Sequence, residues 1–186
     1  MITMKKRMKN IETHSRKLAY ILRHDKEAAT EMEIGGWLPI SYLVEKKGFS
    51  VEEINMLINS DDKGRFELSK SSKMVRALYG HSVNIELNLT PAEPPEFLWH
   101  GSVRTALSEI FNDGILHRSR QFVHLTSDLE SATEIGARHG EPASILVVAG
   151  KMYKEGYKFY HVTDKIWLTK HVPCKYIVIQ HSGIDV

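Results

Sequence analysis

The 186-residue chain has one cysteine, Cys174, and no long apolar run. A single thiol cannot form an internal disulfide or supply a site of several thiolates. The longest strongly apolar stretch is residues 145–149, far below the roughly 18 residues that a membrane-spanning helix needs. The basic N-terminus is followed by no apolar segment with a small-residue cleavage site, so no secretory signal is expected. We therefore expect a cytoplasmic protein that binds no membrane.

Several nucleotide and metal signatures are also missing. The chain has neither a GxGxxG motif nor a Walker A motif, so neither a Rossmann dinucleotide site nor a P-loop is supported. Its 10 histidines include no HExxH spacing, and we expect no metal site. Hydrophobic residues make up 42% of the chain, which is enough for a packed core and excludes wholesale disorder.

Charge is distributed unevenly along the chain. The net charge is +2, but residues 1–90 carry 15 basic and 12 acidic side chains, whereas residues 91–186 carry 10 and 11. The first 26 residues alone hold eight basic and two acidic side chains. This basic segment favours a polyanionic partner such as nucleic acid, although solvated helix faces are often basic too.

A proline-rich segment, residues 89–96, divides the chain. It holds three of the six prolines. Because proline lacks a backbone donor and stiffens the chain, this segment is predicted to be a linker. It separates a first lobe, residues 1–88, from a second lobe, residues 97–186.

The first lobe is predicted to contain three helices and then a β-hairpin. One helix covers residues 13–24, one starts at Pro39 and stops before Gly48, and one is capped by Ser50 with Glu53 three residues on. Short strands at residues 65–68 and 74–78 follow. This order is typical of a winged helix, a common nucleic-acid-binding fold.

The second lobe mixes short strands with helices. Strands are predicted at residues 97–99, 122–125, 144–149, 158–161, 165–168 and 176–180, and helices at residues 103–112 and 129–139. The apolar strand at 144–149 is expected to be buried on both faces. Short strands with only two helices indicate an α+β lobe, so the fold class is predicted to be α+β.

Arginine and histidine residues that could carry chemistry each have a structural explanation as well. Arg23 and His24 end the first helix, where cations meet the dipole favourably; alternatively, Arg23 offers a fork for phosphate and His24 moves a proton. Arg65 and Arg76 could be solvated hairpin cations. His81 and Ser82 follow Gly80 in a segment that could bring donors to a phosphate.

A second group of candidates lies in the other lobe. His100, Gly101 and Ser102 come between a predicted strand and a predicted helix, where glycine would let a ligand approach the backbone and the helix N-terminus favours anions. Arg120 precedes the next strand and His124 lies on it. A histidine on a strand is usually a structural residue with its hydrogen bonds satisfied.

Seven short motifs favour the functional interpretation of these residues over the structural one, because they occur in the order and spacing of a known family. They are Leu22-Arg-His-Asp25, Lys63-Gly-Arg-Phe66, Arg76-Ala-Leu-Tyr-Gly-His-Ser82, Trp99-His-Gly-Ser102, Arg120-Gln-Phe-Val-His-Leu125, Gly136-Ala-Arg-His-Gly140 and Ile166-Trp-Leu-Thr169. Together they resemble the NAD-dependent RNA 2′-phosphotransferase family, the tRNA 2′-phosphotransferases, over nearly the whole chain.

The resemblance implies a winged-helix lobe for RNA, followed by a lobe of the ADP-ribosyltransferase fold for NAD. It implies a catalytic quartet of Arg23, His24, Arg65 and Arg120. It further implies NAD contacts from His100, Gly101, Ser102, His124, Thr126 and Arg138, and RNA or phosphate contacts from Arg76, His81 and Ser82. NAD would be consumed as a co-substrate, no metal would be needed, and we expect a monomer that acts on tRNA-like RNA.

The implied reaction has two steps. An internal RNA 2′-phosphate first attacks the anomeric carbon of the nicotinamide ribose, which releases nicotinamide and gives an RNA-2′-phospho-ADP-ribose intermediate. The ribose 2″-hydroxyl then attacks the phosphorus. The products are RNA with a free 2′-hydroxyl and ADP-ribose 1″,2″-cyclic phosphate.

Two functions of other classes stay open. One is an ADP-ribosyltransferase that modifies nucleic acid or protein; many such enzymes place a glutamate on a late strand, whereas this chain has none after Glu155. The other is a non-catalytic winged-helix regulator. A regulator would explain the basic N-terminal segment, but not why arginine and histidine motifs occur in both halves of the chain.

Overall fold

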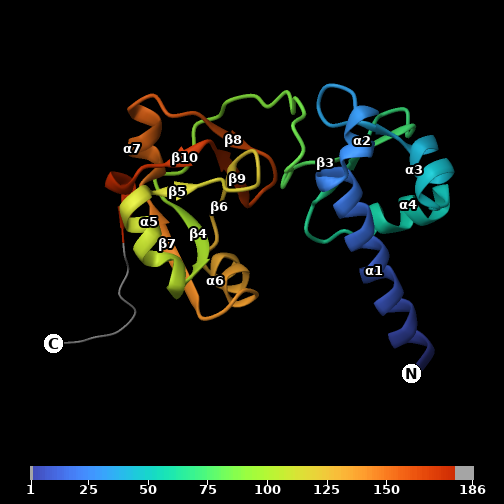
Figure 1. Ribbon diagram of the computed structural model, residues 1–186, viewed down its shortest axis with the longest axis horizontal. Helices are drawn as coiled ribbons and strands as arrows, with labels where there is room; N and C mark the ends of the chain where they lie inside the picture. The colour runs from blue at the N-terminus through green and yellow to red at the C-terminus, as the bar shows by residue number, and fades with distance from the viewer. Residues whose placement is uncertain (1, 179–186) are drawn as a thin grey trace. The chain divides into compact units, whose positions relative to one another are not determined.

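The computed structural model describes the backbone of residues 2–178 and the side chains of residues 11–178. The chain divides into two compact units, Met1–Asn88 and Leu89–Val186, and each has its own hydrophobic core. Both units combine helices with antiparallel strands, so the predicted α+β class is confirmed (Figure 1). Across the described residues, no helix is both long and apolar enough to span a membrane.

Unit 1 begins with α1, Ile2–His24, which is longer than the helix predicted at residues 13–24. Leu18 and Leu22 on its inner face are fully buried in the core of this unit. A short helix, α2, Lys26–Thr30, follows and was not predicted. Asp25 caps it by accepting hydrogen bonds from two backbone N–H groups, an N-cap signal that the sequence does contain.

Helices α3, Ile40–Lys47, and α4, Val51–Asn59, confirm two predictions. Gly48 ends α3 in the left-handed conformation at φ 73°, which glycine adopts without steric cost. The Ser50 hydroxyl accepts from the Glu53 N–H at 3.1 Å, as an N-cap should. The Glu53 carboxylate pairs with His14 on α1 and thereby ties α4 to α1.

The sheet of unit 1 has three strands in the order β1-β3-β2, with bounds Leu38–Pro39 for β1, Phe66–Leu68 for β2 and Met74–Ala77 for β3. Both pairings are antiparallel, and Glu67 lies opposite Arg76 in the hairpin. The hairpin was predicted. The two-residue β1 was not, because so short a strand leaves no alternating pattern.

Unit 2 contains a six-stranded sheet in the order β11-β7-β4-β6-β9-β8, antiparallel throughout. The bounds are Leu98–Val103 for β4, Val123–Thr126 for β6, Pro142–Val147 for β7, Phe159–His161 for β8, Ile166–Thr169 for β9 and Ile177–Val178 for β11. A separate pair joins β5, Ile115–Leu116, to β10, His171–Val172. Residues 179 and 180 of the last predicted strand lie outside the described residues.

One prediction about the sheet was wrong. On β7, Ile145 and Val147 are buried, but Ser144 and Leu146 on the alternate face are only partly buried. This strand therefore has one core face and one partly solvated face, as is usual in an antiparallel sheet.

The helices of unit 2 are α5, Leu107–Asp113, α6, Leu129–Ala137, and α7, Ala149–Lys154, with 3-10 turns η1 at Arg104–Ala106 and η2 at Cys174–Tyr176. Asp128 caps α6 as predicted. The prediction that a helix starts directly after Ser102 was wrong: β4 continues to Val103 and places residues 100–102 inside a strand. The cause is tertiary, because β4 pairs with β7 along its whole length.

Helix α6 packs against β4 at very short range, and Figure 1 shows the two side by side. A Cβ on Gly101 of β4 would lie 2.2 Å from the Ala132 carbonyl oxygen of α6. A Cβ on Gly136 of α6 would lie 2.2 Å from the Ser102 carbonyl oxygen of β4. Each element therefore needs a glycine where the other approaches.

The proline-rich segment 89–96 is attached to unit 2. The Ala92 N–H donates to the Phe159 carbonyl oxygen at 2.9 Å, and the Glu96 carbonyl oxygen accepts from the Gly150 N–H at 3.0 Å. This segment is thus hydrogen-bonded to the rest of unit 2 at Ala92 and at Glu96.

Candidate functional site

The C-terminal end of α1 carries Arg23 and His24, and the segment after β3 returns to it. The N–H groups of Ser82 and Val83 both donate to the Arg23 carbonyl oxygen, at 2.9 and 3.3 Å. They satisfy a carbonyl that the end of the helix would otherwise leave open. The His24 Nδ1 lies 2.8 Å from the Ser82 hydroxyl. Three predicted site residues therefore meet here.

The Arg23 guanidinium lies over the ring of Tyr79, 4.8 Å from its centre. Gly80 makes room for it: its φ is +93°, and a Cβ there would lie 3.1 Å from the Arg23 Nε. Burial raises the pKa of Tyr79 while the Arg23 charge opposes the shift, so the phenol stays protonated at neutral pH. Tyr79 was not singled out from the sequence, although it lies inside one of the seven motifs.

His81 occupies the interior of unit 1. Its side chain is 2% exposed. Burial, reinforced by the charge of Arg23, lowers the pKa of His81 to about 3, so the ring is neutral at physiological pH. A buried neutral ring supports the surrounding fold more directly than it could bind a phosphate, and contact of His81 with RNA stays a prediction.

Arg65 is held by a buried carboxylate. Its Nε donates to Asp61 Oδ1 at 2.7 Å, and Asp61 also accepts from the backbone N–H groups of Arg65 and Phe66. The Asp61 side chain is only 2% exposed. A further bond from Arg65 Nη2 reaches the Ser15 hydroxyl at 3.1 Å. The guanidinium is therefore fixed on two sides.

Arg76 is engaged in contacts within unit 1. Its Nε donates to Glu67 at 2.7 Å across the hairpin, and Nη1 donates to the Gly35 carbonyl oxygen at 3.3 Å. Its guanidinium also lies 4.4 Å from the centre of the Trp37 ring. These contacts give Arg76 a structural role, and its contact with RNA stays a prediction.

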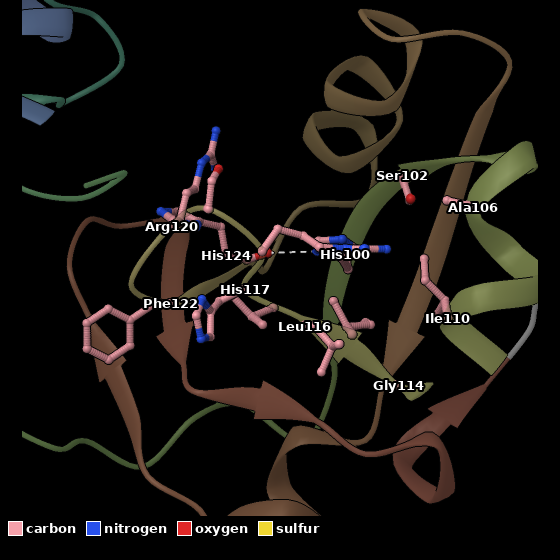
Figure 2. A pocket seen from close by; sticks show the side chains of 14 residues that line it. His100, Ser102, Ala106, Ile110, Gly114, Leu116, His117, Arg120, Phe122 and His124 are labelled. Atoms are coloured by element: carbon pink, nitrogen blue, oxygen red, sulfur yellow. Dashed lines mark hydrogen bonds between the residues drawn. The ribbon is translucent and has the colours of Figure 1, made fainter. Parts of the chain in front are cut away.

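Unit 2 contains a pocket with a volume of about 250 Å³ (Figure 2). It brings together four of the predicted site residues: His100, Ser102, Arg120 and His124. Phe122 and residues of the β5 and α5 region complete the wall. The polar side chains come from strands β4 and β6 and from the loop before β6, so the sheet positions them.

His100 is oriented by a hydrogen bond to the backbone. Its Nδ1 lies 3.0 Å from the His124 carbonyl oxygen, and the dashed line in Figure 2 marks this contact. A carbonyl oxygen can only accept, so Nδ1 carries the hydrogen and Nε2 is the acceptor. Burial lowers the pKa of His100, with the Arg120 charge acting in the same direction, so the ring is neutral.

Three predicted NAD-contacting residues are not among those that line this pocket. Gly101 faces α6, and its lack of a side chain is explained by helix packing. Thr126 is buried, and its hydroxyl accepts from the Asp128 N–H at 3.2 Å ahead of α6. Arg138 is the exposed C-cap of α6. Their contacts with NAD stay predictions.

Other pocket residues were not found from the sequence. His117, Arg118 and Ser119 form a turn closed by the Arg120 N–H, which donates to the His117 carbonyl oxygen at 3.0 Å. Arg118 has φ 55° and pairs with Glu109 at 2.5 Å. The only sequence signal was the run of basic residues before the strand. Within residues 11–178, no group of three or more His, Cys, Asp or Glu side chains is placed to hold a metal ion.

Comparison with known proteins agrees with the motifs. The model of the family described as RNA 2′-phosphotransferase, Tpt1/KptA family, matches residues 9–171. The chain therefore belongs to this family, and the resemblance inferred from the seven motifs is confirmed.

Relatives with the same description cover most of the chain. A probable RNA 2′-phosphotransferase of Acaryochloris marina is 41% identical over 170 residues, which are 88% of this chain and 94% of the relative. One from Flavobacterium johnsoniae is 38% identical, with 88% and 93% covered. One from Agrobacterium fabrum is 36% identical, with 89% and 92% covered.

Proposed function

We propose that this protein is an NAD-dependent RNA 2′-phosphotransferase. It transfers an internal RNA 2′-phosphate to NAD and yields RNA 2′-OH, ADP-ribose 1″,2″-cyclic phosphate and nicotinamide, through RNA-2′-phospho-ADP-ribose. The observation that carries the proposal is the junction of Arg23, His24 and Ser82 at the end of α1, in a chain of this family. The substrate is a tRNA-like RNA, and the enzyme acts as a cytoplasmic monomer.

The proposal assigns a fold type to each unit. The helices α1, α3 and α4 followed by the β2–β3 hairpin support a winged-helix lobe in unit 1. The six-stranded antiparallel sheet with its pocket and flanking helices supports an ADP-ribosyltransferase-like lobe in unit 2. In this assignment unit 1 binds RNA and unit 2 binds NAD.

The pocket of unit 2 suits part of an NAD molecule. Its volume of about 250 Å³ is slightly below the roughly 300 Å³ at which pockets for whole drug-sized ligands begin, so it would take one half of the dinucleotide. His117, Arg118 and Arg120 form a polar and cationic edge for an anionic ligand. The neutral His100 offers its Nε2 as an acceptor for a ribose hydroxyl or an amide.

In the first step, an oxygen of the RNA 2′-phosphate bonds to the anomeric carbon while the bond to nicotinamide breaks. The electron pair of that bond neutralises the pyridinium nitrogen, so the leaving group departs without a proton. The attacking phosphate carries nearly two negative charges near neutral pH. Arg23 and Arg65 can bind these oxygens as planar donors that stay protonated.

In the second step, the ribose 2″-oxygen bonds to phosphorus and the bond from phosphorus to the RNA 2′-oxygen breaks. One proton leaves the attacking hydroxyl and one reaches the leaving alkoxide. His24 is the side chain assigned to move such a proton, and its Nδ1 contact with Ser82 orients the ring. Arg65 and Arg120 stabilise the negative charge that builds on the phosphoryl oxygens.

The test is an incubation with NAD and an oligonucleotide that carries one internal 2′-phosphate, with products identified by mass spectrometry. We expect nicotinamide, ADP-ribose cyclic phosphate and dephosphorylated RNA in equal amounts. An unphosphorylated oligonucleotide of the same sequence is the control. Stable ADP-ribosylated RNA as the end product would favour the transferase alternative, and RNA binding without nicotinamide release would favour a regulator.

A further inference from the structure

The outer face of α1 carries a stripe of three side chains, of which the proposed reaction uses only His24. Arg16, Tyr20 and His24 are spaced four residues apart, so they lie on one face of the helix. The opposite face, with Leu18 and Leu22, is buried in the core of unit 1. The stripe therefore starts at the candidate catalytic histidine and follows the helix toward its N-terminus.

Tyr20 is the feature of this stripe that packing does not explain. It is 59% exposed, and its ring lies 5.7 Å from the ring of His24, tilted by 52°. The other large apolar side chains exposed on the described part of unit 1 are not aromatic: Ile34, Val44, Val51 and Met56. Proteins that bind single-stranded nucleic acid display aromatic rings in this way, as platforms on which bases stack.

Arg16 lies one helical turn further along the stripe, about 6 Å from Tyr20 along the axis. Its side chain is 76% exposed and pairs with Glu12, which is 63% exposed. An ion pair this exposed contributes little to stability, so a phosphate can take the place of the carboxylate. The stripe thus offers a cation, an aromatic ring and a histidine in sequence.

We propose that Arg16 and Tyr20 of this stripe bind single-stranded RNA next to the nucleotide that carries the 2′-phosphate. The inference rests on the proposed function for the position of that phosphate at His24. Tyr20 stacks on the neighbouring base, and Arg16 contacts a backbone phosphate further along. Stacking tolerates every base, so the enzyme grips the flanking nucleotide without reading its identity.

The experiment measures RNA binding without NAD, so that it stays independent of the reaction. The probe is a fluorescent single-stranded RNA with one internal 2′-phosphate, and its Kd is measured by anisotropy. We expect Tyr20→Ala to raise the Kd about 5- to 150-fold, the range typical of losing one base–aromatic stack. Tyr20→Phe keeps the ring and should bind like the unmodified protein. Tyr153→Ala, a change of an exposed helical tyrosine in unit 2, is the matched control.

The stacking partner is identified by a second substrate that has an abasic ribose beside the phosphate-bearing nucleotide, placed on either side in turn. On one side, the abasic RNA should weaken binding to the unmodified protein by the same factor as Tyr20→Ala. The combination of variant and abasic RNA should then lose nothing further, because both changes remove one contact. The proposal would be overturned if the affinity losses from Tyr20→Ala and from the abasic RNA multiplied for both positions of the abasic ribose. It would also be overturned by a Kd for Tyr20→Ala equal to that for Tyr153→Ala.

Arg16 is tested by the salt dependence of the same Kd. Losing one phosphate contact should lower the slope of log Kd against log salt by about 0.7 in Arg16→Ala. Lys70→Ala removes an exposed cation from the turn between β2 and β3 and should leave the slope unchanged. An unchanged slope in Arg16→Ala would remove Arg16 from the stripe. A protein that binds RNA as expected but releases no nicotinamide would keep the stripe and reject the proposed reaction.

Discussion

At the residue scale, Arg65 is held in place by its neighbours. Asp61 and Ser15 hold Arg65 on two sides, so its guanidinium is fixed before any substrate arrives. Preorganised donors stabilise a transition state more effectively than flexible ones, because they need no reordering during the reaction. A fixed cation suits the step in which new negative charge develops.

We predict that Arg65→Ala and Arg120→Ala slow the second step more than the first. The first step expels a cationic pyridinium and needs little help, whereas the second expels a poor alkoxide leaving group. Losing one preorganised donor typically costs roughly 10²–10³ in rate. RNA-2′-phospho-ADP-ribose should therefore accumulate in single-turnover reactions and run as a slower band on a gel with labelled NAD.

Arg104→Ala removes an exposed arginine that pairs with Glu141, and it serves as the control with unchanged kinetics. If Arg65→Ala and Arg120→Ala lowered the rates of both steps equally and no intermediate was seen at any time, these arginines would not act mainly in the second step.

His81 gives a prediction about pH. With a folded-state pKa of about 3 and an unfolded-state pKa near 6.5, only the unfolded chain binds a proton between these values. The free energy of unfolding should therefore fall as pH drops below about 6.5, by up to about 1.4 kcal/mol per pH unit from this residue. When the free energy of unfolding is measured with urea at pH 5, 6 and 7, it should depend less steeply on pH in His81→Phe than in the unmodified protein. Identical slopes would contradict the buried neutral ring.

At the element scale, the contact between α6 and β4 determines what Gly101 does. Gly101→Ala would place a Cβ 2.2 Å from a backbone carbonyl, so α6 must shift. We expect a loss of about 1–3 kcal/mol in the free energy of unfolding of unit 2, as for other overpacked positions. Thermal and urea unfolding would measure it. Ser102→Ala, which removes only a hydroxyl from the next residue of β4, should change stability by far less. Equal effects of the two changes would argue against this packing.

Helix α4 allows its two ends to be compared. Ser50→Ala removes the acceptor for the Glu53 N–H and should cost about 1 kcal/mol of stability. Ser60 at the other end donates its hydroxyl to the Met56 carbonyl oxygen, and Ser60→Ala should cost clearly less, because that carbonyl already accepts from the Ser60 N–H. Urea unfolding of both variants tests the difference, and a larger loss for Ser60→Ala would contradict it.

The sequence predicted correctly those helix ends that are set by a capping residue or a terminating glycine. The caps at Ser50 and Asp128 and the glycine stop at Gly48 all lie where the sequence placed them. The predictions failed where distant pairing decides: β4 runs on to Val103 because β7 lies beside it, and no local pattern reports that neighbour. The short elements β1 and α2 were missed for a related reason, since two to five residues carry too little periodicity.

The same distinction applies to the candidate site. The motifs identified Arg23, His24 and Ser82, because arginine, histidine and serine side chains in these motifs have recognisable chemistry. The structure brings these three residues together. Asp61 and Tyr79 were overlooked because an aspartate in a turn and a tyrosine after a strand are ordinary residues until folding places them against Arg65 and Arg23.

At the scale of the whole molecule, the chain has two cores instead of one. Leu18, Leu38 and Leu57 belong to the first, and Leu98, Val147 and Phe159 to the second. We predict that Gly101→Ala lowers hydrogen-exchange protection in β4, β7 and α6 and leaves the buried amides of α1 and α4 unchanged. Mass spectrometry of exchanged peptides would measure this. Equal loss of protection in both units would show that they unfold as one cooperative body.

The pair Gly101 and Gly136 also has a consequence for how such a protein can change over generations. Each glycine faces a carbonyl of the other element, so neither position can accept a side chain unless the helix and the strand separate. A mutational scan should find substitutions depleted at both positions, and a compensating change in a side chain does not relieve the contact, because the obstacle is backbone. Adaptation of this pocket to a different ligand can therefore proceed through residues such as Ser102 on β4 or Ser119 in the loop, while the two glycines are retained.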